Sequence, residues 1–281
     1  GRSGLFGTTP DGTATQTSGS VHTDHQSAAI TSDTARYGSW PDARTTGANW
    51  TNKSHRGGLT ITKNGTVLSH TIVNGQLTIR ADNVRIRDVV VRTNSFYGIL
   101  VAGKNALITR TTINGAGAMA GMATQSGGQF IARHINVFGS EDGVRLASRC
   151  RLVDSYVHGL KGHQGSHYDA VTADGFVGWQ IRHNTLLNPH SQTSVTYVGD
   201  PRSGGSAGIY RNNYVAGGGY SIYGGPGKNN GIRVVDNVFS TRYFRNGGYW
   251  GVAAHWSSAG SNTWSGNTWI DGPRKGRTVR Q

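Results

Sequence analysis

The sequence has almost no cysteine and very little methionine. Cys150 is the only cysteine among 281 residues, which excludes an internal disulfide, a metal site with cysteine spacing and a redox-active thiol pair. We expect Cys150 to be a small buried hydrophobic residue. The chain has 43 glycines and only two methionines. This composition disfavours a helical bundle and favours strands and turns.

Long apolar stretches are also missing. No run is long enough to span a membrane. We expect no signal peptide in the sequence given, whose opening GRSGLFG looks like a processed or engineered start. We expect an extracellular protein with no membrane association. Residues 11–35 are rich in Thr, Ser, Gly and Gln and predict a loosely ordered arm. We place an N-terminal arm and cap at 1–55 and one folded domain at 56–281.

Acidic residues are scarce. The chain has 14 Asp and Glu against 28 Lys and Arg, which gives a formal net charge of +14. A charge of this sign favours a polyanionic partner, either nucleic acid or acidic polysaccharide. Because no recognised nucleic-acid module or basic helix occurs in the chain, we expect an acidic polysaccharide and not a nucleic acid.

A short repeat is present throughout most of the chain: an apolar residue, any residue, a polar residue, two more residues, then an apolar one. The nine segments are VLSHTI (67–72), IRDVVV (86–91), ITRTTI (108–113), ARHINV (132–137), LVDSYV (152–157), IRHNTL (181–186), YRNNYV (210–215), VVDNVF (234–239) and WSGNTW (264–269). Their starts lie 19 (67 to 86) to 30 (234 to 264) residues apart. This spacing is too short for a unit with a full helix and is typical of a β-solenoid.

A second set of segments supports the same fold. Most repeats are followed by a strand that begins with a small residue, and the next residue is apolar in seven strands: Ile99, Met122, Val144, Val171, Val195, Ile222 and Val252. Such a column predicts an inward-facing stack, because side chains alternate along a strand. We therefore predict an all-β fold, a single right-handed parallel β-helix (β-solenoid) of about nine coils. The alternative, an antiparallel sandwich, needs hairpin turns that the sequence rarely offers.

The repeats followed by DGV or DAV strands resemble the pectin lyase-like parallel β-helix superfamily over roughly residues 56–270. The stretches WPDARTTGANW, GTVLSHTIVNGQLTI and ADNVRIRDVVV resemble the start of right-handed β-helix proteins of actinobacteria and phages. This resemblance implies a parallel β-helix, and it implies function only at the level of the superfamily.

The position before each small residue forms another expected column: Tyr97, Ala120, Asp142, Asp169, Thr193, Tyr220 and Trp250. Asp142 in SEDGV and Asp169 in HYDAV are then neighbours on adjacent coils. In polygalacturonases, which belong to the superfamily, this position supplies catalytic aspartates. The doubled aspartate, the Gly-His-Gly and the Arg-x-Lys of the polygalacturonase pattern are absent here.

Two adjacent aspartates repel each other when both are ionised. The pair therefore predicts a raised pKa, an Arg or His counter-charge, or a bound cation. Calcium is the ion expected from oxygen ligands, with Asp142, Asp169 and Glu141 as its candidate ligands. No other cofactor is expected.

The function expected from these residues is cleavage of a uronate-containing polysaccharide by β-elimination, as in a polysaccharide lyase. Asp142 and Asp169 form the centre, and the candidates for the base are His167, Tyr168, Lys161 and Arg145. The expected substrate-binding residues are His163, Tyr197, Tyr220, Tyr223 and Trp250. The working unit is expected to be a monomer.

Three alternatives stay open. The aspartate pair can act as general acid and base of an inverting glycoside hydrolase. The chain can also be a glycan-binding solenoid without catalysis. Finally, Asp and Asn at strand starts commonly bond their own backbone, and His134 and His183 occupy turn positions where a structural role is expected. Trp250, Trp256, Trp264 and Trp269 can close the end of the solenoid instead of binding sugar.

Overall fold

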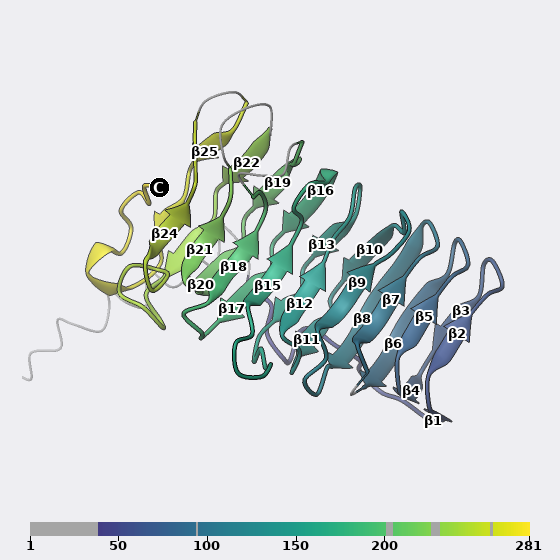
Figure 1. The fold of residues 1–281 in the computed structure, drawn as a ribbon. Helices are drawn as coiled ribbons and strands as arrows, with labels where there is room; N and C mark the ends of the chain where they lie inside the picture. The colour runs from purple at the N-terminus through teal and green to yellow at the C-terminus, as the bar shows by residue number, and fades with distance from the viewer. Residues whose placement is uncertain (1–38, 94, 201–204, 226–230, 259–260) are drawn as a thin grey trace, which may run out of the picture. The chain divides into compact units, whose positions relative to one another are not determined.

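The computed structural model describes residues 39–93, 95–200, 205–225, 231–258 and 261–281 (Figure 1). These residues form strands, turns and one 3-10 helix, η1 (Gly272–Arg274), and contain no α-helix. The pairings between strands of the described residues are parallel, so the antiparallel sandwich is excluded. The predicted arm at 11–35 lies outside the described residues.

One sheet of 17 strands contains the repeat segments. Its strands are β1 (Lys53–Arg56), β3 (Val67–Ser69), β4 (Thr71–Asn74), β6 (Arg85–Arg92), β8 (Ala106–Asn114), β10 (Phe130–Arg133), β11 (Asn136–Phe138), β13 (Arg151–Val153), β14 (Tyr156–Val157), β16 (Val177–Arg182), β17 (Thr185–Asn188), β19 (Ala207–Arg211), β20 (Tyr214–Gly217), β22 (Ile232–Val235), β23 (Val238–Ser240), β25 (Thr263–Ser265) and β26 (Thr268–Trp269). Each repeat bends sharply at its polar third residue, which has a positive φ, as at His134 (53°) and His183 (50°). The His183 Nδ1 lies 2.8 Å from Asp154 Oδ1, in keeping with the structural role expected for it.

A second sheet of nine strands lies between the repeats in sequence. Its strands are β2 (Leu59–Ile61), β5 (Leu77–Ile79), β7 (Tyr97–Val101), β9 (Ala120–Thr124), β12 (Asp142–Arg145), β15 (Tyr168–Thr172), β18 (Thr193–Tyr197), β21 (Tyr220–Tyr223) and β24 (Gly251–Ala254). The order of strands in this sheet is their order in the sequence, so the chain returns to it once per repeat (Figure 1).

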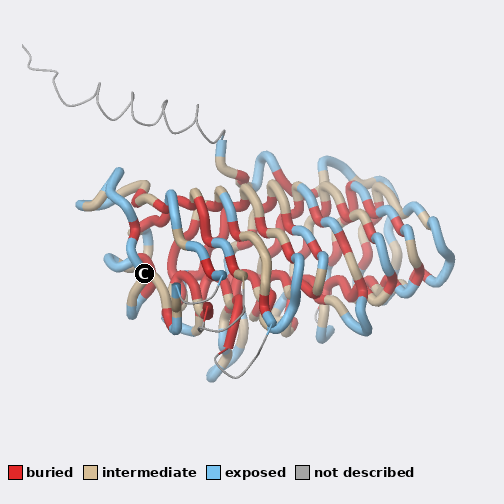
Figure 2. The backbone as a smooth tube through the Cα atoms, turned by 90° about the horizontal axis from the view of Figure 1, so that it is seen from above, coloured by how far each residue is buried: buried red, intermediate tan, exposed pale blue. Residues whose placement is uncertain are grey.

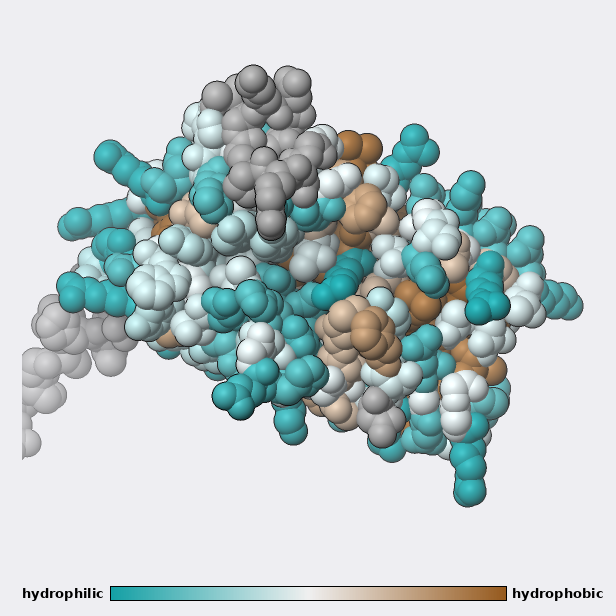
Figure 3. Space-filling model, viewed as in Figure 1, coloured by the Kyte–Doolittle hydropathy of each residue, from teal (hydrophilic) through white to brown (hydrophobic). Residues whose placement is uncertain are grey.

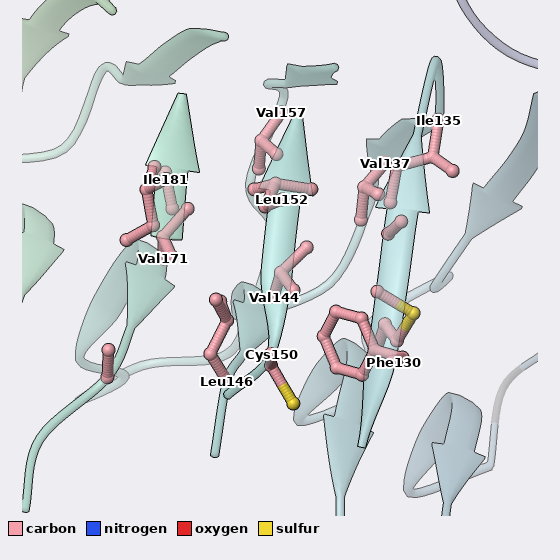
Figure 4. Packing of buried hydrophobic residues seen from close by; sticks show 14 of the residues in the cluster. Phe130, Ile135, Val137, Val144, Leu146, Cys150, Leu152, Val157, Val171 and Ile181 are labelled. Atoms are coloured by element: carbon pink, nitrogen blue, oxygen red, sulfur yellow. The ribbon is translucent and has the colours of Figure 1, made fainter. Parts of the chain in front are cut away.

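The core lies between the two sheets. Its residues are the apolar positions of the repeats and the inward residues of the second sheet, and buried and exposed positions alternate along the chain (Figure 2). Figure 4 shows Val144 and Leu146 among the residues packed with Leu152 and Phe130. Cys150 is fully buried in the same cluster, as predicted from the sequence.

Small residues begin the strands of the second sheet because the chain packs closely there. A Cβ added to Gly143 would lie 2.3 Å from Val157 Cγ1 and 2.3 Å from the Ala170 carbonyl oxygen, and one added to Gly98 or Gly121 would also clash. The requirement for glycine at this position is therefore steric.

Three register predictions are wrong, in the first repeat, in β18 and in β24. Leu68 pairs with Ile86, so the first repeat occupies 68–73 and not 67–72. In the second sheet Asp169 pairs with Ser194, and Val171 pairs with Thr196. The predicted Thr193 and Val195 are thus displaced by one residue in β18, whereas Tyr220 and Ile222 of β21 keep the predicted register.

A separate displacement by one residue occurs in β24, where Gly251 and Ala253 replace the predicted Trp250 and Val252. In β18 the register is favoured by polar contacts, because Ser194 bonds Asp169 and the Thr196 hydroxyl lies 3.1 Å from the buried Tyr210 hydroxyl. Both registers place small or apolar residues inside, so the apolar pattern alone does not distinguish them.

A ladder of buried asparagines joins four successive repeats of the 17-stranded sheet: Asn184, Asn213, Asn237 and Asn267. The Oδ1 of Asn213 accepts hydrogen bonds from the backbone N–H and the side-chain amide of Asn184, both at 3.0 Å. The Nδ2 of Asn213 donates to Asn237 Oδ1 and to the Ile181 carbonyl oxygen. Every polar atom of such a buried amide therefore has a partner, as a buried polar group requires.

Residues 39–52 extend across the turns of several repeats. Trp40 packs against His183, Gly47 donates its N–H to the His134 carbonyl oxygen at 2.8 Å, and Trp50 stacks on His70 at 3.9 Å. The segment therefore crosses the repeats in the direction opposite to their order in the sequence.

Candidate functional site

Asp142 and Asp169 lie on the adjacent strands β12 and β15, as the repeat predicted. The register pairs Arg145 with Thr172 and Val144 with Val171, which sets the two aspartates opposite each other. Their side chains are largely buried, with 3% of Asp142 and 7% of Asp169 exposed. The backbone N–H of Asp169 donates to Asp142 Oδ1 at 3.1 Å.

The two carboxyl groups have different partners. Arg145 donates from Nε to Asp142 Oδ2 at 2.7 Å, and its Nη2 lies 2.7 Å from the same oxygen. Asp169 Oδ1 accepts hydrogen bonds from the backbone N–H of Ser194 at 2.9 Å and from the Ser194 hydroxyl at 2.5 Å. Asp142 therefore has a cationic partner, whereas Asp169 has only neutral donors among the described residues.

Burial raises the pKa of both carboxyl groups, because an ionised carboxylate is destabilised when it loses water. The pKa of Asp142 rises to about 6, with the Arg145 guanidinium limiting the rise. Burial, together with the charge of Asp142, raises the pKa of Asp169 to about 8. Burial therefore favours a pair that carries one proton, and the Arg145 guanidinium favours Asp142 as its ionised member.

The structural role expected for aspartates at strand starts is also present. Each of the two uses Oδ1 to accept a backbone N–H from the next strand, Asp142 from Asp169 and Asp169 from Ser194. Within the described part of the chain no hydrogen bond occupies Asp169 Oδ2. One oxygen of Asp169 thus supports the fold, and the other is free to act on a ligand.

The pair opens into a hollow of about 390 Å³, a size within the usual range of small-ligand sites. The lining residues are Thr124, Asp142, Arg145, Leu146, Asp169, Thr172, Asp174, Phe176 and Tyr197. Tyr197 stacks in parallel on Tyr223, with ring centroids 4.8 Å apart. Burial raises the pKa of Tyr197, and the hydrogen bond that its hydroxyl donates to Asp200 raises this pKa further.

Other predicted catalytic residues lie outside this lining. Tyr168 stacks on His190 with centroids 3.8 Å apart, and the ring of His167 lies 3.1 Å from Thr193 Oγ1. Lys161 is exposed. Of the predicted catalytic set, the hollow brings together Asp142, Asp169 and Arg145.

Glu141 and His163 line a different hollow of about 390 Å³ beside Phe96. Glu141 accepts hydrogen bonds from the Ser166 hydroxyl at 2.8 Å and from the His167 backbone N–H at 3.2 Å. Its carboxylate therefore fixes the loop before β15 and does not join the aspartate pair.

The predicted aromatic binding residues separate into two places. Tyr220 and Tyr223 make an edge contact, and Tyr223 extends the stack of Tyr197. Trp250 is 66% exposed and contacts Tyr249. The other three C-terminal tryptophans pack against the core or belong to it, as expected if they close the end of the fold: Trp256, Trp264 and Trp269.

Six residues of the site were not predicted from the sequence: Thr124, Leu146, Thr172, Asp174, Phe176 and Ser194. The first five line the hollow, and Ser194 bonds Asp169. Asp174 and Phe176 follow β15 directly in TADGF, so their closeness in sequence to Asp169 was the available signal. Ser194 was missed because the predicted register placed Thr193 beside Asp169.

The arrangement around the pair gives little support to a calcium site. Asp142 is already paired with a guanidinium, and Glu141 is bonded to the loop before β15. Among the described residues no three His, Cys, Asp or Glu side chains form a group that could hold a metal ion. A hard cation needs six to eight oxygen ligands, and the arginine competes for the site by its charge.

The face seen in Figure 1 is mostly hydrophilic, with smaller hydrophobic areas between the polar side chains (Figure 3). Among the described residues, none belongs to a helix of the length and apolarity needed to cross a membrane. Comparison with models of protein families, with curated proteins and with solved structures finds no match.

Proposed function

We propose that this chain is a secreted carbohydrate-active enzyme that hydrolyses an acidic polysaccharide at Asp142 and Asp169. We further propose that residues 56–281 are a right-handed parallel β-solenoid of about nine coils, in which successive coils place these two residues side by side. The pectin lyase-like superfamily, which the repeats resemble, supports this assignment by analogy.

The observation that carries the proposal is the unequal environment of the two carboxyl groups. Asp142 is held ionised by Arg145, and Asp169 is kept protonated by burial. A neighbouring ionised and protonated carboxyl pair has the chemistry of glycoside hydrolysis. Asp169 serves as the acid and Asp142 as the anionic partner.

The spacing favours a retaining mechanism over the inverting one that the sequence left open as an alternative. Paired side chains on adjacent strands project in one direction, so the strand spacing of about 4.8 Å sets the scale of their separation. Retaining enzymes hold their carboxyl groups about 5–5.5 Å apart, whereas inverting enzymes need room for water between them.

In the first step Asp169 donates its proton to the glycosidic oxygen as the bond to the anomeric carbon breaks. An Asp142 oxygen forms a bond to that carbon. In the second step water attacks the anomeric carbon and releases Asp142, while Asp169 accepts the proton of the water. Both residues end each cycle in their starting states.

The charges of the site are compatible with a uronate unit. Asp169 is neutral when protonated, and the charge of Asp142 is offset by Arg145, so the pair repels a carboxylate weakly. The net charge of +14 attracts a polyanion over longer distances. Tyr197 and Tyr223 offer an aromatic surface beside the hollow for a sugar ring.

A lyase is the second candidate, because Arg145 beside the pair has the chemistry to neutralise a uronate carboxylate. β-Elimination also needs a base that is active near neutral pH. Among the described residues no Lys or His lines the hollow, and the raised pKa of Tyr197 disfavours its ionisation. Hydrolysis therefore has more support than elimination.

Incubation with a panel of polysaccharides tests the proposal. The panel contains pectate, alginate, glucuronan and glycosaminoglycans, each with and without EDTA. We expect new reducing ends without the ultraviolet absorbance of an unsaturated product, and no effect of EDTA. Matching absorbance would establish elimination, and an EDTA-sensitive rate would restore the calcium site. If no polymer is cleaved but one binds saturably, the chain is a glycan-binding protein.

The pH dependence of cleavage should be bell-shaped. Activity is lost as the pH falls through about 6, where Asp142 becomes protonated, and as it rises through about 8, where Asp169 loses its proton. In Arg145→Gln the acidic limb should move to higher pH, because the guanidinium lowers the pKa of Asp142. The measurement is initial rate against pH, and an unmoved acidic limb in the variant would argue against Asp142 as the anionic group.

A further inference from the structure

The outer face of the 17-stranded sheet carries a dense set of arginines. On β6, β8, β10, β13, β16, β19 and β22 the residues on either side of the buried first residue of the repeat face outward, because side chains alternate along a strand. Val235, which is buried, is the exception. None of these outward residues is acidic or lysine. We call the seven arginines among them the arginine face: Arg85, Arg87, Arg133, Arg151, Arg182, Arg211 and Arg233.

One end of the arginine face contains a hollow of about 430 Å³. Leu107 and Ile131 lie on successive strands between Arg85 and Arg151 in the register, and all four line the hollow together with Arg149. The site therefore combines an aliphatic floor with guanidinium groups at its edges.

The arginines around this hollow are available to a ligand. Within the described part of the chain no carboxylate lies at ion-pair distance from Arg85, Arg149 or Arg151, and all three residues are exposed. Three other arginines of the face pair with aspartates at the turns. The positive charge at the hollow is thus not offset locally.

We propose that the arginine face is a second binding surface, which takes a linear polysaccharide that carries carboxylate or sulfate groups. A guanidinium binds such oxyanions through two parallel hydrogen bonds. Leu107 and Ile131 provide apolar contact for the C–H faces of the sugar rings. This surface lies on a different sheet from Asp142 and Asp169.

The composition of the face favours a polysaccharide over nucleic acid. No outward residue of the seven strands is aromatic, whereas single-stranded nucleic acid is commonly bound by stacking its bases on aromatic rings. A pleated sheet face also presents no protruding helix or ribbon that could enter a duplex groove. The inference shares its polymer class with the proposed function but does not depend on cleavage.

The test compares two triple variants of equal charge in binding to immobilised polygalacturonate and heparin. In R85Q/R149Q/R151Q we expect the Kd for polygalacturonate to rise about tenfold, since three exposed charge contacts are lost, each weak by itself. Its salt dependence should also become shallower. The control R80Q/R245Q/R277Q removes three exposed arginines from other places and should change the Kd less than about twofold.

Two results would overturn the inference: equal weakening by both triple variants, which would show an effect of net charge alone, or tighter binding of single-stranded DNA than of either polysaccharide. Loss of binding in R85Q/R149Q/R151Q from a chain that cleaves no polymer would support the arginine face and contradict the proposed function. If the chain cleaves a polymer and R85Q/R149Q/R151Q binds it as tightly as the original, the proposed function is supported and the arginine face is contradicted.

Discussion

Replacement of Asp169 with asparagine is expected to lower the rate of polysaccharide cleavage by about a hundredfold to ten-thousandfold. An amide cannot donate the proton that the leaving oxygen needs. Its Oδ1 can still accept the hydrogen bonds from Ser194, so the fold should remain intact. The measurement is the initial rate of reducing-end release at the optimum pH, with thermal unfolding recorded for the same samples.

Asp236→Asn is the matched control for this variant. Asp236 is likewise an aspartate with a side-chain partner, Arg211 at 3.0 Å, but it lies in the repeat 234–239 at a turn of the other sheet. Its replacement should leave the rate within about twofold of the original, because a surface ion pair contributes little. A normal rate in Asp169→Asn, or an equal loss in both variants, would remove Asp169 from the reaction.

Replacement of Asn213 with alanine should lower the free energy of unfolding by about 3 kcal/mol or more. The side chain is fully buried and holds four hydrogen bonds. Its loss leaves the Asn184 backbone N–H and the Asn237 Oδ1 without one of their partners in a region closed to water. Urea unfolding followed by circular dichroism measures the effect.

Asn74→Ala provides the comparison, because Asn74 is an exposed residue of β4 whose amide donates to Ser54 and His55. We expect its unfolding free energy to change by less than about 0.5 kcal/mol. If the two substitutions destabilise the protein to the same extent, the ladder contributes no more than an ordinary surface amide.

The all-β character and the parallel pairing follow from the sequence because the repeat constrains both. An apolar residue recurs at each end of the segment, and a polar residue between them tolerates the positive φ of the bend, as at Asp154 (50°) and Asp236 (56°). Each segment must bury its apolar ends, and only stacking on the neighbouring repeats provides that burial.

The register of β18 and β24 could not be predicted from apolar periodicity. Ser194, Val195 and Thr196 are all buried, so the burial of apolar residues does not show which of them faces the core. The register depends on hydrogen bonds, in which Ser194 meets Asp169 and Thr196 meets Tyr210. These partners lie 25 and 14 residues away in the chain, beyond any local pattern.

The strand residues of the candidate site were easier to predict than its loop residues. Asp142, Arg145 and Asp169 lie on two adjacent strands, whose pairing the repeat predicts. His163 and His167 belong to a loop that Glu141 fixes through Ser166, so their positions depend on a contact with no periodic signal. The asparagine ladder had a signal, since Asn recurs at the fourth position of four successive repeats.

The segment 39–52 alters how the repeats unfold together. In an array of stacked repeats each unit is coupled to its nearest neighbours alone, and the array can open from either end. Here Trp50 touches the first repeat and Trp40 contacts Tyr214 of the seventh. If the first strands open, the contacts that residues 39–52 make several repeats away are also lost. We therefore expect the repeats that this segment contacts to unfold as one cooperative unit. The repeats after Tyr214 lack this long-range link among the described residues, so we expect them to open before the others.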